Sequence, residues 1–204
     1  MRIFRCVLAL VVLGAIAVQL HRKLGIAGFD PVNFFSFFTI VSNIFGAAVL
    51  LAAAFEVPED RHLRDVLRGV ATLSLVIVGV VFSVLLASGD SGLMPWVNAI
   101  VHYAMPILIA LDWCLDPPRT PVSRRDATTW LVLPAAYLVY ALVRGAFVHW
   151  YPYPFLNVDA IGYAGVAAYS AGILVFSLLA AYALMTLGNT LRARAGRTNA
   201  REPA

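Results

Sequence analysis

One histidine, His102, lies in an apolar stretch that runs from Met94 to Leu111. An ionisable side chain in a segment of membrane length is costly to bury, so it is a functional hypothesis by default. Asn98 precedes His102 by four residues and therefore shares its face on a helix. A buried imidazole can act as a general base, and the question is which nucleophile lies beside it.

Hydroxyl side chains occur at a matching depth in an earlier apolar segment. At 100° per residue, Ser36, Thr39 and Asn43 fall on one stripe of a helix. Thr39 lies about six residues past the outer end of its segment and His102 about seven past its own, so both are expected at a depth of about 10 Å. A hydroxyl beside a histidine is the minimal apparatus for nucleophilic acyl transfer. The sequence therefore predicts that Thr39 or Ser36 is the nucleophile and that His102 is the general base.

Further polar residues could support this pair. Asn98, Asp159 or a backbone carbonyl could orient the imidazole, and Arg144 or the Asn43 amide could stabilise an oxyanion or bind a carboxylate. Pro106 has no N–H for the carbonyl four residues earlier, which frees an acceptor and allows a local kink. The kink is expected to help open a pocket.

A non-catalytic interpretation stays open. Ser and Thr in membrane helices commonly bond their own backbone, Asn often joins helices, and Arg144 could simply reach the interface. A small-solute or proton-linked carrier, or a structural partner, is the alternative function. The sequence has no His-x-x-x-His or Cys-x-x-Cys spacing and only one convincingly buried histidine. We expect neither metal nor organic cofactor.

Composition indicates which elements hold these residues. The chain has 204 residues, 61% of them hydrophobic and 13% charged, and its mean hydropathy is +0.83. Soluble domains carry about 25% charged residues. Apolar runs near the length of a bilayer span predict an all-α, polytopic membrane protein with six transmembrane helices. The expected spans are Ile3–Leu20, Asn33–Phe55, Val70–Ala87, Pro95–Leu115, Thr129–Val148 and Tyr163–Leu187.

Arginines predict the orientation of these spans. Twelve arginines flank the spans on one side, whereas only Arg22 and Lys23 flank them on the other. Basic residues accumulate on the cytoplasmic side, so both termini are expected in the cytoplasm. The pI near 9.3 is explained by these juxtamembrane clusters, and no nucleic-acid partner is predicted. The expected partners are the bilayer and a membrane lipid or lipid-like ester substrate, and the oligomeric state is not predicted.

The chain is expected to form one domain. Residues 1–188 are predicted to be the six-helix transmembrane domain and 189–204 a cytoplasmic Arg-rich tail with a disordered end. The first apolar run continues past the small-residue site at Ala15–Ala17, which favours a retained span over a cleaved signal. The connection 116–127 contains three prolines and is predicted to be a stiff turn without helix. Cys6 and Cys114 are expected to stay reduced.

Three motifs, in this order, resemble the androgen-induced (AIG/FAR-like) membrane protein family and its bacterial "Pr-six-Pr" branch. The resemblance rests on the segment Phe34–Asn43, on Trp96-Val97-Asn98 followed by His102 and Pro106, and on the segment Trp150–Leu156.

This resemblance implies a chemistry for the polar residues. Animal members of the family are multipass hydrolases of fatty acid esters of hydroxy fatty acids, and they use an intramembrane Thr and His. His102 matches the family histidine in its Trp-x-Asn-x-x-x-His context. The family's Phe-x-Thr-Phe context falls on Phe34–Phe37 and puts Ser36 at the threonine position, whereas Thr39 matches by residue type. The function implied is that of a threonine- or serine-type lipid ester hydrolase.

Overall fold

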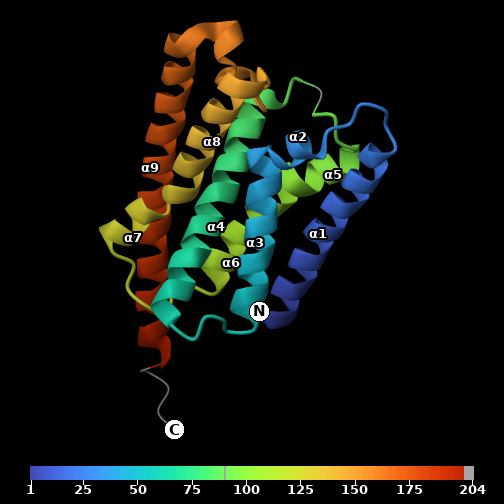
Figure 1. Ribbon diagram of the computed structural model, residues 1–204. Coiled ribbons are helices and arrows are strands. Elements are labelled where there is room, and N and C mark those ends of the chain that lie inside the picture. The colour runs from blue at the N-terminus through green and yellow to red at the C-terminus, as the bar shows by residue number, and fades with distance from the viewer. Residues whose placement is uncertain (90, 200–204) are drawn as a thin grey trace.

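The computed structural model describes residues 1–89 and 91–199 of the chain. All regular structure in these ranges is helical (Figure 1), as predicted. The elements are α1 (Arg2–Leu24), α2 (Pro31–Phe35), α3 (Phe38–Ala54), α4 (Arg61–Val81), η1 (Phe82–Leu86), α5 (Pro95–Ala99), η2 (Ile100–Ala104), α6 (Met105–Leu115), α7 (Arg124–Thr129), α8 (Val132–Val148), η3 (Pro154–Leu156) and α9 (Val158–Asn199).

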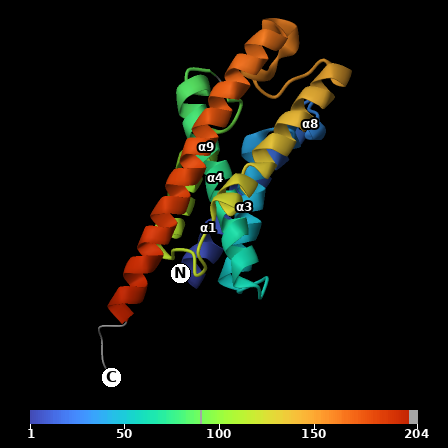
Figure 2. The ribbon, with the colours of Figure 1, turned by 90° about the vertical axis from the view of Figure 1, so that its left-hand side faces the viewer.

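Helix α4 lies at the centre of the bundle. It contacts α3, α6 and α9, and α1 packs on the far side of α3. Figure 1 shows the N-terminus and the end of α9 at the same end of the bundle, which we call the terminal face. We call the other end the distal face. Figure 2 shows α8 and α9 in front when the molecule is viewed from the side away from α1.

Within the described residues, five helical segments are long and apolar enough to cross a bilayer. They are Arg2–Leu24, Arg61–Leu86, Pro95–Leu115, Arg124–Val148 and Val158–Gly196. Large apolar side chains such as Val139, Phe147 and Leu179 are exposed on α8 and α9, which is expected where a helix faces lipid instead of water. The chain is thus built as an integral membrane protein, while six spans stay a prediction.

The predicted span Asn33–Phe55 is wrong as a continuous helix. Helix α2 ends at Phe35, and α3 begins at Phe38 after an extended residue, Phe37, with φ −77° and ψ 130°. Asp30 caps α2 by accepting from the N–H of Val32 at 2.8 Å, which starts a short separate helix. Helix α3 alone has 17 residues and is therefore shorter than a usual span.

The third span begins earlier in the sequence than predicted. Helix α4 starts at Arg61 because the Asp60 carboxylate accepts from the N–H groups of His62 and Leu63. Arg64 and Arg68, which we expected in a loop, are therefore buried on the first turns of a helix. The end of this segment agrees with the predicted Ala87 within one residue, because η1 continues the helix as a π-helical turn to Leu86.

The last two predicted spans are extended by helix outside their bounds. The turn predicted at 116–127 ends in α7, where Ser123 and Asp126 form a reciprocal capping box. Helix α9 begins before Tyr163 and continues beyond Leu187 to Asn199, with a kink at Gly162, whose φ is 67°. Residues 200–204, for which disorder was predicted, lie outside the described residues. Cys6 and Cys114 are free.

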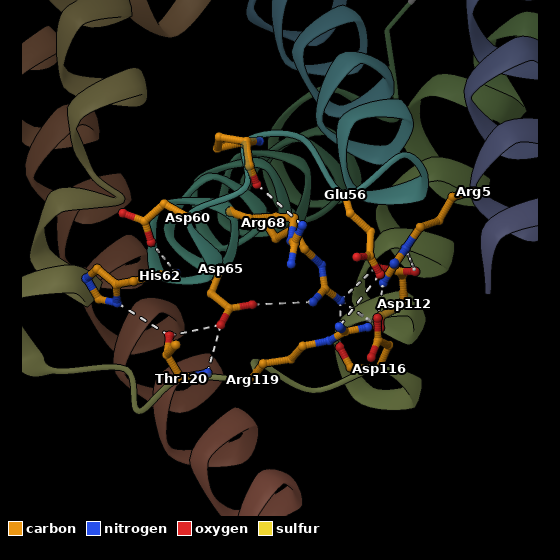
Figure 3. A network of polar contacts seen from close by, with 12 residues as sticks. Arg5, Glu56, Asp60, His62, Asp65, Arg68, Asp112, Asp116, Arg119 and Thr120 are labelled. Atoms are coloured by element: carbon orange, nitrogen blue, oxygen red, sulfur yellow. Dashed lines mark hydrogen bonds and ion pairs between the residues drawn. The ribbon is translucent and has the colours of Figure 1, made fainter.

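A buried ion cluster ties three helices together near the terminal face (Figure 3). Asp112 of α6 accepts from Arg5 Nε of α1 at 2.7 Å and from Arg68 Nη2 of α4 at 2.9 Å. Arg5 also donates to Asp116 at 2.6 Å. Burial alone would raise the pKa of Asp116, but the hydrogen bond from Arg5 and the nearby arginines hold that pKa below its ordinary value. Arg5 and Arg68 were predicted only to orient the chain in the membrane, and they also join three helices through these contacts.

Candidate active site

Thr39 and His102 meet between α3 and η2, near the distal face. Thr39 Oγ1 lies 3.2 Å from His102 Nε2, and both side chains are almost fully buried, at 6% and 5% exposed. The two residues are 63 apart in sequence and are brought together by the packing of their helices. A hydroxyl at this distance from an imidazole nitrogen can pass it a proton.

Local backbone structure places each of the two side chains. Thr39 is the second residue of α3, immediately after the break at Ser36 and Phe37. His102 lies in the π-helical turn η2, where the N–H of Met105 donates to the carbonyl of Ile100. Pro106 follows this turn and cannot donate, so the kink expected at the proline takes the form of a π turn. Such turns are frequent at functional sites.

Asn98 orients the imidazole. Its Oδ1 lies 2.9 Å from His102 Nδ1, one helical turn away. An amide oxygen only accepts, so this contact assigns the proton to Nδ1 and leaves Nε2 unprotonated toward Thr39. This is the tautomer that a general base needs.

Phe82 and Asn43 hold the two halves of the site together. The ring of Phe82 in η1 stacks on the imidazole at 3.8 Å with an interplanar angle of 15°. Asn43 Nδ2 donates to the carbonyl of Thr39 at 2.8 Å and to that of Val101 at 3.1 Å. Asn43 thereby bridges α3 to the turn that carries His102, and its amide protons are directed to backbone oxygens.

Ser36 lies outside the Thr39–His102 pair. Its hydroxyl donates to the carbonyl of Val32 at 2.6 Å and lies 2.7 Å from Tyr140 Oη. Its carbonyl accepts from Tyr137 Oη at 2.9 Å. The break between α2 and α3 separates Ser36 from the stripe that a continuous helix would have made.

Arg144 and Asp159 also have partners away from the imidazole. Arg144 donates to Asn33 Oδ1 at 2.7 Å and lies over the ring of Trp150, 5.1 Å from its centroid. Asp159 lies 3.3 Å from His149 Nδ1 on the exposed surface. Neither contact therefore directs these side chains to the imidazole.

Tyr153 is the polar neighbour that sequence reasoning missed. Its phenol oxygen lies 3.2 Å from the backbone nitrogen of Thr39 and 3.3 Å from Thr39 Oγ1. The residue belongs to the aromatic and proline-rich loop before α9, within the segment Trp150–Leu156 that contributes to the family resemblance. The signals in the sequence were the position of this tyrosine between two prolines and its place in that motif, and neither indicates which way its ring points.

Two cavities meet at Thr39. An apolar cavity of about 390 Å³ lies between α4, α8 and α9, and we call it the inner cavity. A second cavity of about 720 Å³, the surface cavity, reaches the exposed residues Asp30, Ser88 and Ser91 and is also lined by His102. Thr39 and Tyr153 line both cavities, so Thr39 lies where the two cavities adjoin.

Among the described residues, no group of three or more His, Cys, Asp or Glu side chains has a metal-binding arrangement.

Comparisons with known proteins identify a family. A comparison with curated proteins and one with solved structures each found no match. A family model described as FAR-17a/AIG1-like protein matches residues 7–186 of this chain, which is most of its length. The chain therefore belongs to the FAR-17a/AIG1-like family.

Proposed function

We propose that this protein is a threonine-type lipid ester hydrolase, with Thr39 as nucleophile and His102 as general base. The observation that carries the proposal is the 3.2 Å contact between Thr39 Oγ1 and His102 Nε2. The contact of Asn98 with the other ring nitrogen, at 2.9 Å, supports it because it leaves Nε2 free to accept a proton.

The reaction has two steps. Thr39 Oγ1 attacks the ester carbonyl carbon while His102 Nε2 takes the hydroxyl proton, and the imidazolium then protonates the leaving alcohol oxygen. The product of this step is an acyl-threonine and a free alcohol. Water then attacks the acyl carbon and gives one proton to His102. His102 passes this proton to Thr39 Oγ1 as the fatty acid leaves. No metal or organic cofactor is needed in either step.

The cavities indicate how a lipid ester would bind. The inner cavity, at about 390 Å³, falls in the range of about 300–1,000 Å³ typical of small-molecule sites. Its lining of Ile77, Val78, Leu138 and Leu174 suits an acyl chain. The surface cavity reaches polar groups and suits the alcohol portion and the incoming water. The ester group would then lie at Thr39.

The remaining predicted site residues take supporting roles in this proposal. Asn43 fixes the spacing of α3 and η2 through two backbone carbonyls. Ser36 binds Tyr140 and its own helix, so we assign it a structural role. Arg144 and Asp159 hold the loops that cover the distal face.

The membrane arrangement follows from the same helices. We propose six spans, with α2 and α3 together forming the second. Helix α3 has 17 residues, and at about 1.5 Å each these cover about 26 Å of a core about 30 Å thick. From the arginines near the terminal face we infer that both termini lie in the cytoplasm, and we propose that the membrane is a bacterial plasma membrane. The site would then lie in the outer leaflet of the plasma membrane.

Family membership supports the proposed activity. The animal members that this chain resembles are hydrolases of fatty acid esters of hydroxy fatty acids and use an intramembrane threonine and histidine. Fold and family alone do not fix a substrate, so the proposal for this chain rests on the geometry of Thr39 and His102.

The proposal is tested by labelling with a fluorophosphonate that carries an acyl chain. We expect the wild type to be labelled and both Thr39→Ala and His102→Ala to lose labelling, because one lacks the nucleophile and the other its base. Ser36→Ala is the matched control, since it also removes a buried hydroxyl of the same segment, and it should be labelled like the wild type. Undiminished labelling of Thr39→Ala in folded protein would contradict the proposal.

A further inference from the structure

Tyr153 reaches the proposed nucleophile from a loop far away in sequence. It lies 114 residues after Thr39, in the segment that precedes η3. Its ring is stacked on Phe155 at 5.2 Å and meets the edge of Phe37 at 5.6 Å. These contacts bury the ring and hold the phenol against Thr39.

The hydrogen bonds of this phenol leave its proton available. The oxygen accepts from the N–H of Thr39 at 3.2 Å. The phenol oxygen also lies 3.3 Å from Thr39 Oγ1, to which its hydroxyl can donate, whereas hydroxyl donors usually approach oxygen to about 2.7–2.8 Å. The phenol therefore donates only a weak hydrogen bond in the resting site. A better acceptor beside Oγ1 would receive that hydrogen bond instead.

The start of α3 makes the same location electropositive. Thr39 is the second residue of that helix, and Phe37, at the N-cap position, makes no side-chain cap hydrogen bond. The first N–H groups of a helix have no partner within the helix and carry the positive end of its dipole. An N–H that donates to a phenol also polarises that phenol and makes it a stronger donor.

Attack by Thr39 would create a negative charge at this location. When Oγ1 bonds to the ester carbon, the carbonyl oxygen becomes an oxyanion one bond beyond the nucleophile. Preorganised donors aimed at that oxygen supply a large part of catalysis in acyl transfer. Tyr153 lies between the inner and surface cavities, where the ester group would bind.

We propose that Tyr153 is a catalytic residue whose phenol hydroxyl donates to the oxyanion formed by attack of Thr39. The inference rests on the proposed hydrolase function and adds a third group to it. In each step the phenol keeps its proton and only redirects its hydrogen bond from Thr39 Oγ1 to the developing oxyanion. Burial raises the pKa of Tyr153 above its ordinary value, so the phenol stays protonated at neutral pH.

The test is the substitution Tyr153→Phe in the full-length protein in detergent micelles. It keeps the stacked ring and removes only the hydroxyl. With a fluorogenic fatty acyl ester we expect kcat to fall about 100- to 1,000-fold, as for loss of one oxyanion donor, with little change in KM. Tyr140→Phe is the matched control: it also removes a phenol hydroxyl, which lies 2.7 Å from the Ser36 hydroxyl, and Tyr140 lines neither cavity. It should keep kcat within about threefold of the wild type.

A pair of inhibitors separates catalysis from loop positioning. An acyl trifluoromethyl ketone forms a tetrahedral adduct with the nucleophile and carries an oxyanion, whereas the matching ether does not. Tyr153→Phe should weaken the ketone about as much as it lowers kcat/KM and leave the ether unchanged. Equal weakening of both inhibitors, or an unchanged kcat, would overturn the inference. Undiminished activity of Thr39→Ala would instead overturn the proposed function itself, so the two failures are distinguishable.

Discussion

Removing the charge of Asp112 tests whether the ion cluster near the terminal face is a desolvated structural element. The substitution Asp112→Asn keeps the shape of the side chain but leaves Arg5 and Arg68 facing a neutral amide. The side chains of Arg5 and Arg68 are each 6% exposed, and the side chain of Asp112 is 2% exposed. Water therefore cannot replace the lost carboxylate.

The expected magnitude follows from what the arginines retain. Removing one partner of a buried pair costs about 3–5 kcal/mol, because a buried charge is left uncompensated. Arg5 still has Asp116 at 2.6 Å, and Arg68 still donates to the Asp116 carbonyl at 2.6 Å. These contacts point to the lower end of the range, so we expect a loss of about 3 kcal/mol in the free energy of unfolding. For a chain of this size that corresponds to about 6–12 °C in Tm.

The assay is reversible unfolding in mixed micelles, with helix content followed by circular dichroism. Glu56→Gln is the matched control, because it makes the same acid-to-amide change in an ion pair with Arg119 that is open to solvent. That pair is 3.7 Å long and its side chains are 46% and 65% exposed, so its loss should cost about 0–1 kcal/mol. If Asp112→Asn cost no more than Glu56→Gln, the reasoning from burial would be refuted.

Two further predictions concern the orientation of the imidazole and the response to acid. Asn98→Leu should lower kcat about 10- to 100-fold, which is the range for partners that orient metal-binding histidines. Asn98→Asp should keep most of the activity, because the aspartate still accepts from Nδ1. Equal kcat values for the two variants would contradict the assigned tautomer. Because the pKa of Asp116 is held below its ordinary value of 3.8, its contribution to stability is present above that value and lost as pH falls through the lower native pKa. Tm should therefore decline below about pH 4 in the wild type and decline less in Asp116→Asn, and identical pH profiles would exclude this role.

The sequence predicted that Thr39 and His102 lie at the same depth, because the rise per residue of a helix converts a residue's position in a span into its depth in the membrane. It could not separate Thr39 from Ser36, since a continuous helix puts both hydroxyls on one stripe. The extended residue Phe37 breaks that stripe, and nothing in a run of phenylalanines predicts where a helix will break. The choice between the two hydroxyls therefore required the structure.

The arginines show a different limit. Counting basic residues on each side of the membrane is informative about orientation, but it treats Arg5 and Arg68 like any other flanking charge. Their pairing with Asp112 spans 107 and 44 residues, and such contacts follow from helix packing rather than local pattern. Tyr153 was missed for the same reason, because its loop reaches Thr39 only after the bundle has formed.

The ion cluster and the candidate site share helix α6 and its preceding turn, and what separates them bears on function. Between His102 and Asp112 the buried side chains of α6 include Met105 and Ile109, which are 0% and 2% exposed. Leu50 of α3 and Leu75 of α4 lie in the same apolar cluster. A carrier would need a polar route through this layer toward the terminal face. A hydrolase needs none, because lipid can enter the inner cavity while water and the alcohol pass through the surface cavity. The buried apolar side chains between His102 and Asp112 therefore favour a site that is served from the distal side.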